Sequence, residues 1–114
     1  MKAKKGQRWV FGKDIDIIPC GEGISRKILA YNDDMMTVEN HFITGAIGPL
    51  HSHPHTQITY VLSGKFEFEI DGEKQIVVTG DTMLKTDAVI HGCVCLEKGV
   101  LLDIFTPMRE DFTS

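Results

Sequence analysis

From Ile15 onward, hydrophobic and polar residues alternate in short runs with a period of two, which is typical of half-buried β-strands. No stretch repeats apolar residues at the 3.6-residue period of an amphipathic helix. Strands are therefore predicted over residues 24–31, 35–43, 57–62, 66–70, 75–79, 82–85, 91–96 and 100–106. Many short strands with regular turn signals between them favour a β-sandwich or β-barrel.

Turn-forming residues separate these runs. Turns are expected at Asn32-Asp33, Gly45 to Pro49, Ser63-Gly64, Asp71-Gly72, Gly80-Asp81 and Lys98-Gly99. The Asp71-Gly72 pair is the clearest, because a strictly alternating run from Lys65 ends there and Asp-Gly readily adopts the positive φ of a tight hairpin. Residues 1–14 are mixed in charge apart from Trp9, Val10 and Phe11, so we expect an arm that docks through these residues.

Length and charge narrow the classes of function. The 114 residues are enough for one domain, expected over residues 1–114 with a barrel core over 24–106. The net charge of −4 is made of interspersed acids and bases, which argues against a nucleic-acid partner. The chain lacks a signal-peptide pattern and any apolar run of about 18 residues, so we expect a soluble cytoplasmic protein with no membrane partner. Three cysteines, an odd number, are then expected to be reduced thiols.

Histidines gather in one segment. His51, His53, His55 and Gln57 occupy alternate positions, so they share one face if the chain stays extended past Pro54. Imidazole is the commonest protein ligand for borderline divalent metals, and a further histidine, His91, could complete a metal site. Cys93 and Cys95 are alternative ligands, although alternate strand positions also suit small buried residues. His41 has no matching partner and is expected to be structural.

The spacing of these residues resembles the two motifs of the cupins. The first reads Gly45, five residues, His51, one residue, His53, three residues, Gln57, six residues, Gly64. His91, eleven positions after Gly80, matches the histidine of the second motif, whose other marks are replaced by Thr86, Ala88 and Cys95. The resemblance implies an all-β, single-domain cupin fold, which is a double-stranded β-helix or jelly-roll barrel. The first motif usually has glutamate where Gln57 stands, so a metal site here would carry less negative charge.

A closer resemblance, to the KdgF family of pectin-degradation cupins, covers residues 30–33, 48–55, 66–68 and 103–112. It implies ring opening of 4,5-unsaturated monouronates from pectin and alginate breakdown to linear 5-keto-4-deoxyuronate. The implied metal ligands are His51, His53, Gln57 and His91, and the implied residues around the substrate are Asp103, Phe105 and Arg109. The metal is a divalent ion, with nickel, iron, manganese, cobalt and zinc all open. Cupins also imply a homodimer formed by exchange of N-terminal strands, for which Trp9 to Phe11 offer a contact.

The residue types suit this chemistry. Ring opening needs a base for the anomeric proton, a proton at C4, and stabilisation of a developing enolate, which a divalent cation supplies as a Lewis acid. Asp103 lies in an otherwise apolar strand on the same face as Phe105, which makes it the candidate general acid/base. Arg109 follows that strand and could clamp a substrate carboxylate. The alternatives are a structural Asp103 held by the backbone or by an arginine such as Arg109, and an ion pair of Arg109 with Glu110 or Asp111.

Two other functions fit the same ligands. An iron-dependent cupin dioxygenase would consume oxygen, whereas ring opening is redox-neutral. A non-catalytic sugar-binding or sensory cupin would bind tightly without turnover and would tolerate replacement of Asp103.

Overall fold

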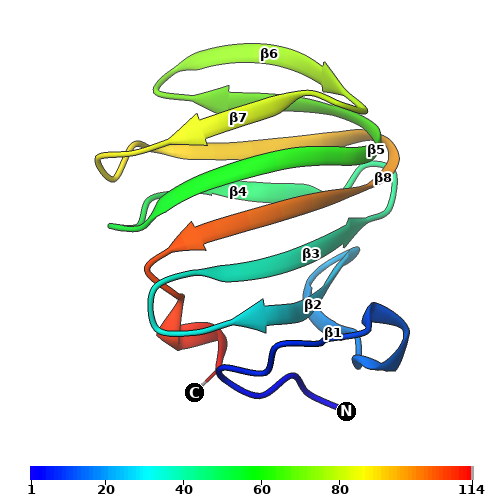
Figure 1. The fold of residues 1–114 in the computed structure, drawn as a ribbon. Coiled ribbons are helices and arrows are strands. Elements are labelled where there is room, and N and C mark those ends of the chain that lie inside the picture. Colours follow the sequence, from blue (N-terminus) through cyan, green and yellow to red (C-terminus); the bar gives the residue numbers. More distant parts are fainter. Residues whose placement is uncertain (114) are drawn as a thin grey trace.

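Eight antiparallel strands and two short 3₁₀ turns make up the computed structural model, which describes residues 1–113 (Figure 1). No α-helix occurs in these residues, as the period-two pattern predicts. The elements are η1 (Gly12–Asp14), β1 (Ile18–Gly21), β2 (Ile24–Tyr31), β3 (Met36–Phe42), β4 (Ile47–His51), β5 (Thr56–Ile70), β6 (Glu73–Val78), β7 (Thr82–Lys85), β8 (His91–Thr106) and η2 (Glu110–Phe112).

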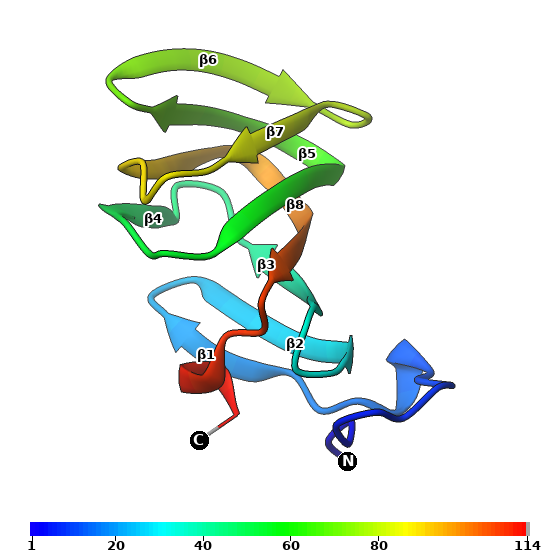
Figure 2. The same ribbon diagram turned by 60° about the vertical axis from the view of Figure 1, so that its left-hand side comes forward.

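Strand β8 organises the sheet. The strand order is β1-β2-β3-β8-β5-β6, with β4 also paired to β8 and β7 also paired to β5. The two views of the ribbon show the strands stacked from β1 at one end to β6 at the other, with the sheet curling over on itself (Figures 1 and 2). This is the all-β, jelly-roll architecture expected for a cupin. Because β8 pairs with β3, β4 and β5, residues far apart in the sequence meet along it.

The predicted hairpin is confirmed, but two predicted turns are wrong. Residues 65–70 pair with residues 73–78 around Asp71-Gly72, and Asp71 has the expected positive φ of 50°. Ser63-Gly64 and Lys98-Gly99 are instead irregularities within the continuous strands β5 and β8, where the register shifts. The backbones approach so closely here that a Cβ on Gly64 would lie 2.6 Å from the Cα of Gly99. Glycine therefore marks a bulge and close approach, a signal that resembles a turn in the sequence.

The histidine-rich segment is not one extended strand. β4 begins at Ile47, inside the predicted turn over residues 45–49, and ends at His51. Residues 52–55 form a loop before β5 starts at Thr56. The shared face expected for His51, His53, His55 and Gln57 is therefore wrong as a single-strand pattern. The residue before a proline still favours extended backbone, but Pro54 itself cannot donate to a ladder, so strand pairing lapses here.

Two apolar clusters fill the interior. The larger contains ten buried residues, including Phe42 and Phe66, whose rings meet edge to face with centroids 5.3 Å apart. The smaller consists of Met36, Val38, Phe105 and Met108, with Phe112 packed against it. Burial of apolar area is the main favourable contribution to folding of such a sheet. Between them, the clusters leave a pocket whose walls carry the candidate functional residues.

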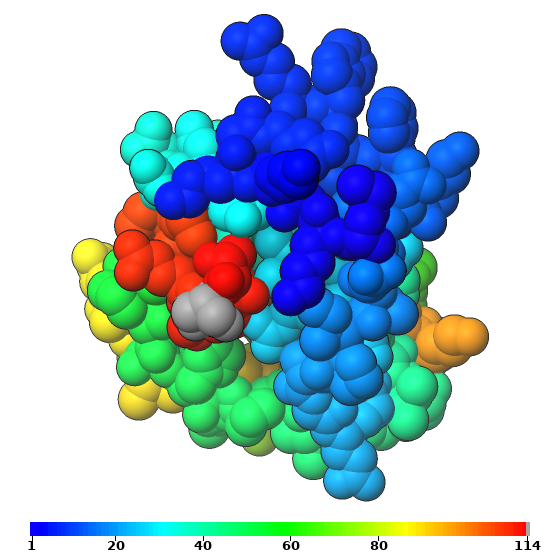
Figure 3. All heavy atoms as spheres, turned by 90° about the horizontal axis from the view of Figure 1, so that it is seen from below, coloured from blue at the N-terminus to red at the C-terminus, as the bar shows by residue number. Residues whose placement is uncertain are grey.

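The N-terminal arm lies along the β2 end of the molecule. It is held by the Gly6 amide, which donates to Tyr31 O at 2.9 Å, and by Lys27 Nζ, which donates to Gly12 O at 2.9 Å. Figure 3 shows the N-terminal residues in blue next to the C-terminal residues in red. Trp9 and Phe11 are 75 % and 59 % exposed, so these aromatic residues do not dock on their own chain. Within residues 1–113, no helix is long and apolar enough to cross a membrane.

Candidate metal and ligand site

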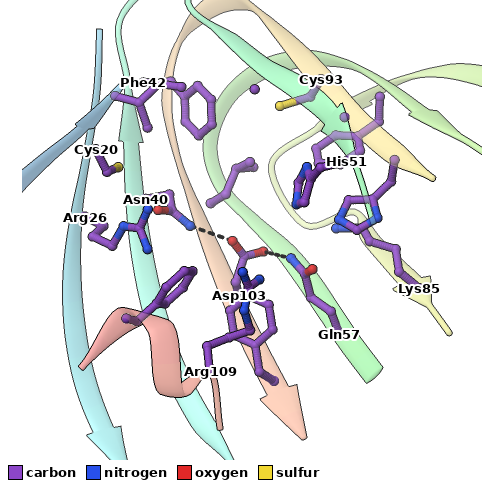
Figure 4. A pocket seen from close by; sticks show the side chains of 18 residues that line it. Cys20, Arg26, Asn40, Phe42, His51, Gln57, Lys85, Cys93, Asp103 and Arg109 are labelled. Atoms are coloured by element: carbon purple, nitrogen blue, oxygen red, sulfur yellow. Dashed lines mark hydrogen bonds between the residues drawn. The ribbon is translucent and has the colours of Figure 1, made fainter. Parts of the chain in front are cut away.

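The pocket between the two clusters brings most of the predicted site residues together. It encloses about 160 Å³, below the roughly 300–1,000 Å³ of sites for drug-sized ligands, so its size favours a ligand no larger than one sugar ring. Its polar and charged lining comes from the six strands β2, β3, β4, β5, β7 and β8 and from the C-terminal segment (Figure 4). These residues are Arg26, Asn40, His51, Gln57, Lys85, His91, Asp103 and Arg109.

Three histidines form a group with the geometry of a metal site. One ring nitrogen from each of His51, His53 and His91 lies within 4.8 Å of the others. His51 ends β4 and His91 begins β8, where the two residues pair across the ladder, whereas His53 comes from the loop between β4 and β5. The structure therefore brings these three predicted residues together, through pairing of β4 with β8 and the following loop rather than through one shared strand.

The histidine nitrogens are arranged for a cation. Nδ1 of His51 lies 2.9 Å from Pro49 O, and Nδ1 of His91 lies 3.0 Å from Val89 O. An N–H at each Nδ1 therefore donates to a carbonyl and leaves the Nε2 lone pair free, which is the usual arrangement of metal-ligating histidines. His91 Nε2 is buried with no hydrogen-bond partner in residues 1–113. A divalent ion fits this donor set, because it would satisfy the unpartnered nitrogen.

Burial keeps the inner histidines neutral. Loss of solvation lowers the pKa of His91 to about 4, and it also lowers the pKa of His53 from its usual value. The neutral imidazole is the form that binds metal, so both rings are ready to act as ligands at neutral pH. His51 is exposed and forms the open side of the group.

Gln57 connects the histidines to Asp103. Its Oε1 lies 2.8 Å from His53 Nε2, and its Nε2 donates to Asp103 Oδ1 at 2.8 Å. Because the amide nitrogen is directed at the carboxylate, the carbonyl oxygen points to the histidine group. Gln57 is buried at the start of β5, opposite Phe105 of β8. An amide oxygen in this position can add a neutral fourth ligand to the three imidazoles.

Asp103 is buried but richly hydrogen-bonded. Besides Gln57, its carboxylate accepts from Asn40 Nδ2 at 2.5 Å and from Thr59 Oγ1 at 2.5 Å. The alternative in which an arginine or the backbone holds Asp103 is not what the structure has, since these partners are neutral side chains from β3 and β5. These hydrogen bonds from two strands hold the carboxylate in a fixed position in the pocket wall.

Lys85 is a site residue that the sequence analysis missed. It is only 2 % exposed on β7, and its Nζ donates to Thr59 Oγ1 at 2.5 Å. Because Lys85 and Gln57 can only donate to that hydroxyl, the single proton of Thr59 is directed at Asp103. Burial lowers the pKa of Lys85, while the nearby charge of Asp103 raises it. The sequence signal that could have found Lys85 is the alternation in β7, where Met83 and Lys85 point inward.

Arg109 lies at the edge of the pocket but is already paired. Its Nε and one Nη donate to the two carboxylate oxygens of Asp111 at 3.0 and 2.9 Å. The guanidinium carbon also lies 4.5 Å from the centroid of the Phe112 ring and 5.3 Å from that of Phe105. The pair with Asp111 was one of the two predicted roles for Arg109, and it coexists with a place in the pocket wall.

The other predicted candidates lie outside the three-histidine group. His55 Nε2 is 3.2 Å from Met108 O, so this ring connects the loop before β5 to the C-terminal segment. His41 Nε2 is 2.6 Å from Glu39 Oε1 on the same strand, away from the pocket. Cys93 lines the pocket, but burial raises the pKa of its thiol to about 12, so it stays protonated. Cys95 is buried in the larger apolar cluster.

The charges around the pocket contrast with those of the whole chain. The protein has a formal net charge of −4, yet the lining contains Arg26, Lys85 and Arg109 against a single carboxylate, Asp103. A bound divalent cation would add further positive charge. A pocket of this kind attracts anionic ligands.

Comparison with known proteins agrees with the fold and the spacing of the site. The cupin domain family model matches residues 39–105. The chain is 51 % identical over 94 residues to pectin degradation protein KdgF of Dickeya dadantii, covering 81 % of this chain and 86 % of that protein. KdgF from Halomonas sp. superposes with a TM-score of 0.89 at 37 % identity, over 93 % of this chain and 98 % of that one. An RmlC-like cupin from Shewanella frigidimarina superposes with a TM-score of 0.92 at 36 % identity, over 96 % and 99 % of the two chains.

The family match covers more than half of the chain, and the similarity to the KdgF proteins covers nearly all of it. The chain thus belongs to the cupin family, in the group of the KdgF pectin degradation proteins.

Proposed function

We propose that the protein is a metal-dependent enzyme that opens the ring of 4,5-unsaturated monouronates from pectin or alginate to give linear 5-keto-4-deoxyuronate. One observation carries the proposal. Three clustered histidines are linked by the Gln57 side chain to the buried carboxylate of Asp103, in a pocket about the size of one sugar ring. Similarity to pectin degradation protein KdgF supports the choice of substrate class.

The proposed metal ligands are His51, His53, Gln57 and His91. When bound, a divalent ion supplies Lewis-acid stabilisation of the oxygen on which negative charge develops. Nickel, iron, manganese, cobalt and zinc all accept three nitrogens and an amide oxygen, so the donor set leaves the metal open. The protein's own contribution is to hold neutral donors in place through backbone carbonyls and Asp103.

Asp103 is the proposed acid/base. In the reaction the anomeric hydroxyl loses its proton, the bond between C1 and the ring oxygen breaks, and C4 gains a proton as the enolate becomes a ketone. The reaction is an isomerisation, so one carboxylate that accepts the first proton and delivers one to C4 keeps the balance. Asn40, Gln57 and Thr59 hold this carboxylate in position for both transfers.

Phe105 and Arg109 form the proposed substrate wall. Phe105 is 3 % exposed, and its ring meets His53 edge to face with centroids 5.7 Å apart, so it would exclude water from that side of a bound metal. Arg109 stacks near the same ring and keeps the N–H groups that Asp111 does not engage for the substrate. Both residues act by positioning an anionic sugar.

The test follows the ultraviolet absorbance of the conjugated double bond in an unsaturated monouronate. Wild-type protein, Asp103→Ala and metal-stripped protein are compared with the spontaneous rate in buffer. We expect acceleration that depends on both metal and Asp103, with no oxygen uptake at an electrode. Decay no faster than in buffer would reject ring opening in favour of a binding protein, and oxygen consumption would identify a dioxygenase.

A homodimer is proposed as the working form. Trp9 and Phe11 leave large apolar areas exposed, and the outward side of β5 adds Ile58, Tyr60 and Leu62, each at least 40 % exposed. The three β5 residues occupy alternate positions and so form one exposed apolar row, a feature that often marks an interface. Light scattering should give twice the chain mass of 12.7 kDa, and a Trp9→Ala, Phe11→Ala double variant should dissociate. A monomeric wild type at working concentration would reject the proposal.

The cytoplasm is the proposed place of action. All three cysteines are free thiols, and one of them, Cys93, lies in the wall of the pocket. A reducing compartment preserves such thiols. Fractionation of cells that express the protein should recover it with cytoplasmic markers, and recovery with another fraction would contradict this location.

A further inference from the structure

Arg26 is a second guanidinium in the pocket, and none of the roles described above uses it. It lies on β2, pairs in register with Asn40 of β3, and lines the pocket. Figure 4 shows Arg26 and Asn40 on one side of Asp103, with His51, Gln57 and Lys85 on the other. The side chain therefore faces the ligand space from the side opposite the histidine group.

No acidic side chain in residues 1–113 forms an ion pair with Arg26. The Nε of Arg26 is also buried without a hydrogen-bond partner in these residues. A buried donor without an acceptor is costly, typically by about 1–3 kcal/mol and more for a charged group. Such a group is commonly completed by a ligand.

The two arginines differ in what they can offer an anion. Asp111 occupies Nε and one Nη of Arg109, the edge that would otherwise bind a carboxylate in bidentate fashion. The corresponding Nε of Arg26 is unused. Arg26 is therefore a better candidate than Arg109 to bind a carboxylate.

Arg26 is also held in a fixed orientation. Its guanidinium carbon lies 3.9 Å from the centroid of the Phe112 ring, so the planar group stacks on the aromatic face. A planar donor fixed in this way loses little conformational entropy when it binds a planar carboxylate, which lysine cannot match. Phe112 thus contacts the guanidinium groups of both Arg26 and Arg109.

We propose that Arg26 binds the carboxylate of the uronate through its guanidinium and thereby selects acidic over neutral sugars. This assignment rests on the proposed function, but its test does not need turnover. It makes Arg26 the principal carboxylate contact and leaves Arg109 as a wall residue that is already neutralised.

The experiment measures binding of two saturated sugars, galacturonate and neutral galactose, to metal-loaded protein by calorimetry or ligand-observed NMR. Arg26→Met keeps the apolar stem against Phe112 but removes the charge. Arg26→Lys restores the charge without the planar fork. Lys27→Met is the matched control, because Lys27 is the next residue on β2, points to the other face and bonds Gly12 O outside the pocket.

Arg26→Met is expected to weaken galacturonate binding by about 10-fold or more and to leave galactose binding unchanged, since hydrogen bonds to charged groups contribute roughly 1.5–3 kcal/mol. Arg26→Lys should fall between this variant and the wild type, and Lys27→Met should match the wild type. In turnover of the unsaturated substrate, Arg26→Met should raise KM by a similar factor with kcat within about threefold.

Three outcomes would overturn the assignment. The first is an affinity of Arg26→Met for galacturonate within twofold of the wild-type value. The second is an equal loss of affinity for galacturonate and galactose in Arg26→Met. The third is a wild-type protein that does not prefer galacturonate to galactose. A wild type that binds galacturonate through Arg26 but does not open the unsaturated ring would reject the proposed function alone. A wild type that opens the ring with the same KM as Arg26→Met would reject the role of Arg26 alone.

Discussion

On one side of Asp103 the pocket presents the lone pairs of buried histidine nitrogens, whereas on the other it presents the N–H groups of arginines (Figure 4). The histidine side lacks a cation, since His91 Nε2 has no partner in residues 1–113. On the arginine side Arg109 is paired with Asp111, but Arg26 Nε has no partner in residues 1–113. A ligand that satisfies both sides must bring opposite charges, and a metal ion together with an acidic sugar does so.

The difference between the histidine side and the arginine side also explains the surroundings of Asp103. Its partners Asn40, Gln57 and Thr59 are all neutral, although two arginines line the same pocket. A direct ion pair with an arginine would hold the carboxylate more tightly and would make a proton transfer harder. Neutral donors fix its position and leave Arg26 for an anion that enters from solvent.

Replacement of His91 by alanine should have the largest effect, because it removes a ligand from the histidine side. We expect ring opening to fall to the spontaneous rate and the content of bound metal, measured by elemental analysis, to fall with it. His41→Ala is the matched control, because His41 pairs with Glu39 outside the pocket. Full metal content in His91→Ala would remove His91 from the proposed ligand set.

Asp103→Asn should come next. A general acid/base contributes typically 10²–10⁴-fold, so we expect kcat to fall by roughly this factor while the fold remains. Asp33→Asn, which changes a surface acid paired with Lys5, serves as the control. Retention of more than a tenth of wild-type kcat would assign the proton transfer to another group.

The metal-free protein should lose stability in acid through His91. Its pKa is about 4 in the folded state against about 6.5 when unfolded, so below pH 6.5 the unfolded chain binds a proton that the folded chain does not. Unfolding free energy from urea titrations should fall by on the order of 2 kcal/mol between pH 6.5 and 4 and change no further from this group below pH 4. His91→Asn should show a smaller slope, and parallel curves would argue against burial as the cause.

Asp111→Asn should have the smallest effect. Asp111 is largely exposed, and exposed ion pairs contribute at most about 1 kcal/mol, so the thermal midpoint should change little. Because Arg109 loses its bidentate partner, galacturonate affinity should increase by about two- to threefold. A larger increase than the loss caused by Arg26→Met would reverse the ranking of the two arginines.

Local signals in the sequence predicted much of this molecule. The all-β architecture and the hairpin at Asp71-Gly72 depend on alternation and turn residues within short segments, and the resemblance to the cupins implied the jelly-roll fold. The three predicted histidines do form one group. The roles of Asp103, Phe105 and Arg109 in catalysis stay predictions.

Local sequence signals could not predict the features that depend on strand pairing. Lys85 is buried because β7 pairs with β5 and brings it next to Thr59, a contact between residues 26 positions apart. Within residues 1–113, Arg26 Nε has no hydrogen-bond partner because of what surrounds it in space, which no local pattern encodes. Gly64 and Gly99 were predicted as turns because a bulge and a turn require the same backbone freedom.

The central place of the last strand has a consequence for biosynthesis. His91 and Asp103 are both on β8, which also completes the pairing of β3 and β4. A chain still being made on the ribosome therefore exposes unpaired edges of β3 and β4 until β8 has emerged, which favours slow folding and association of nascent chains. The three-histidine group is incomplete until His91 has been added, so correct metal binding should follow synthesis of β8. Dependence on chaperones should be highest for chains stalled before residue 91.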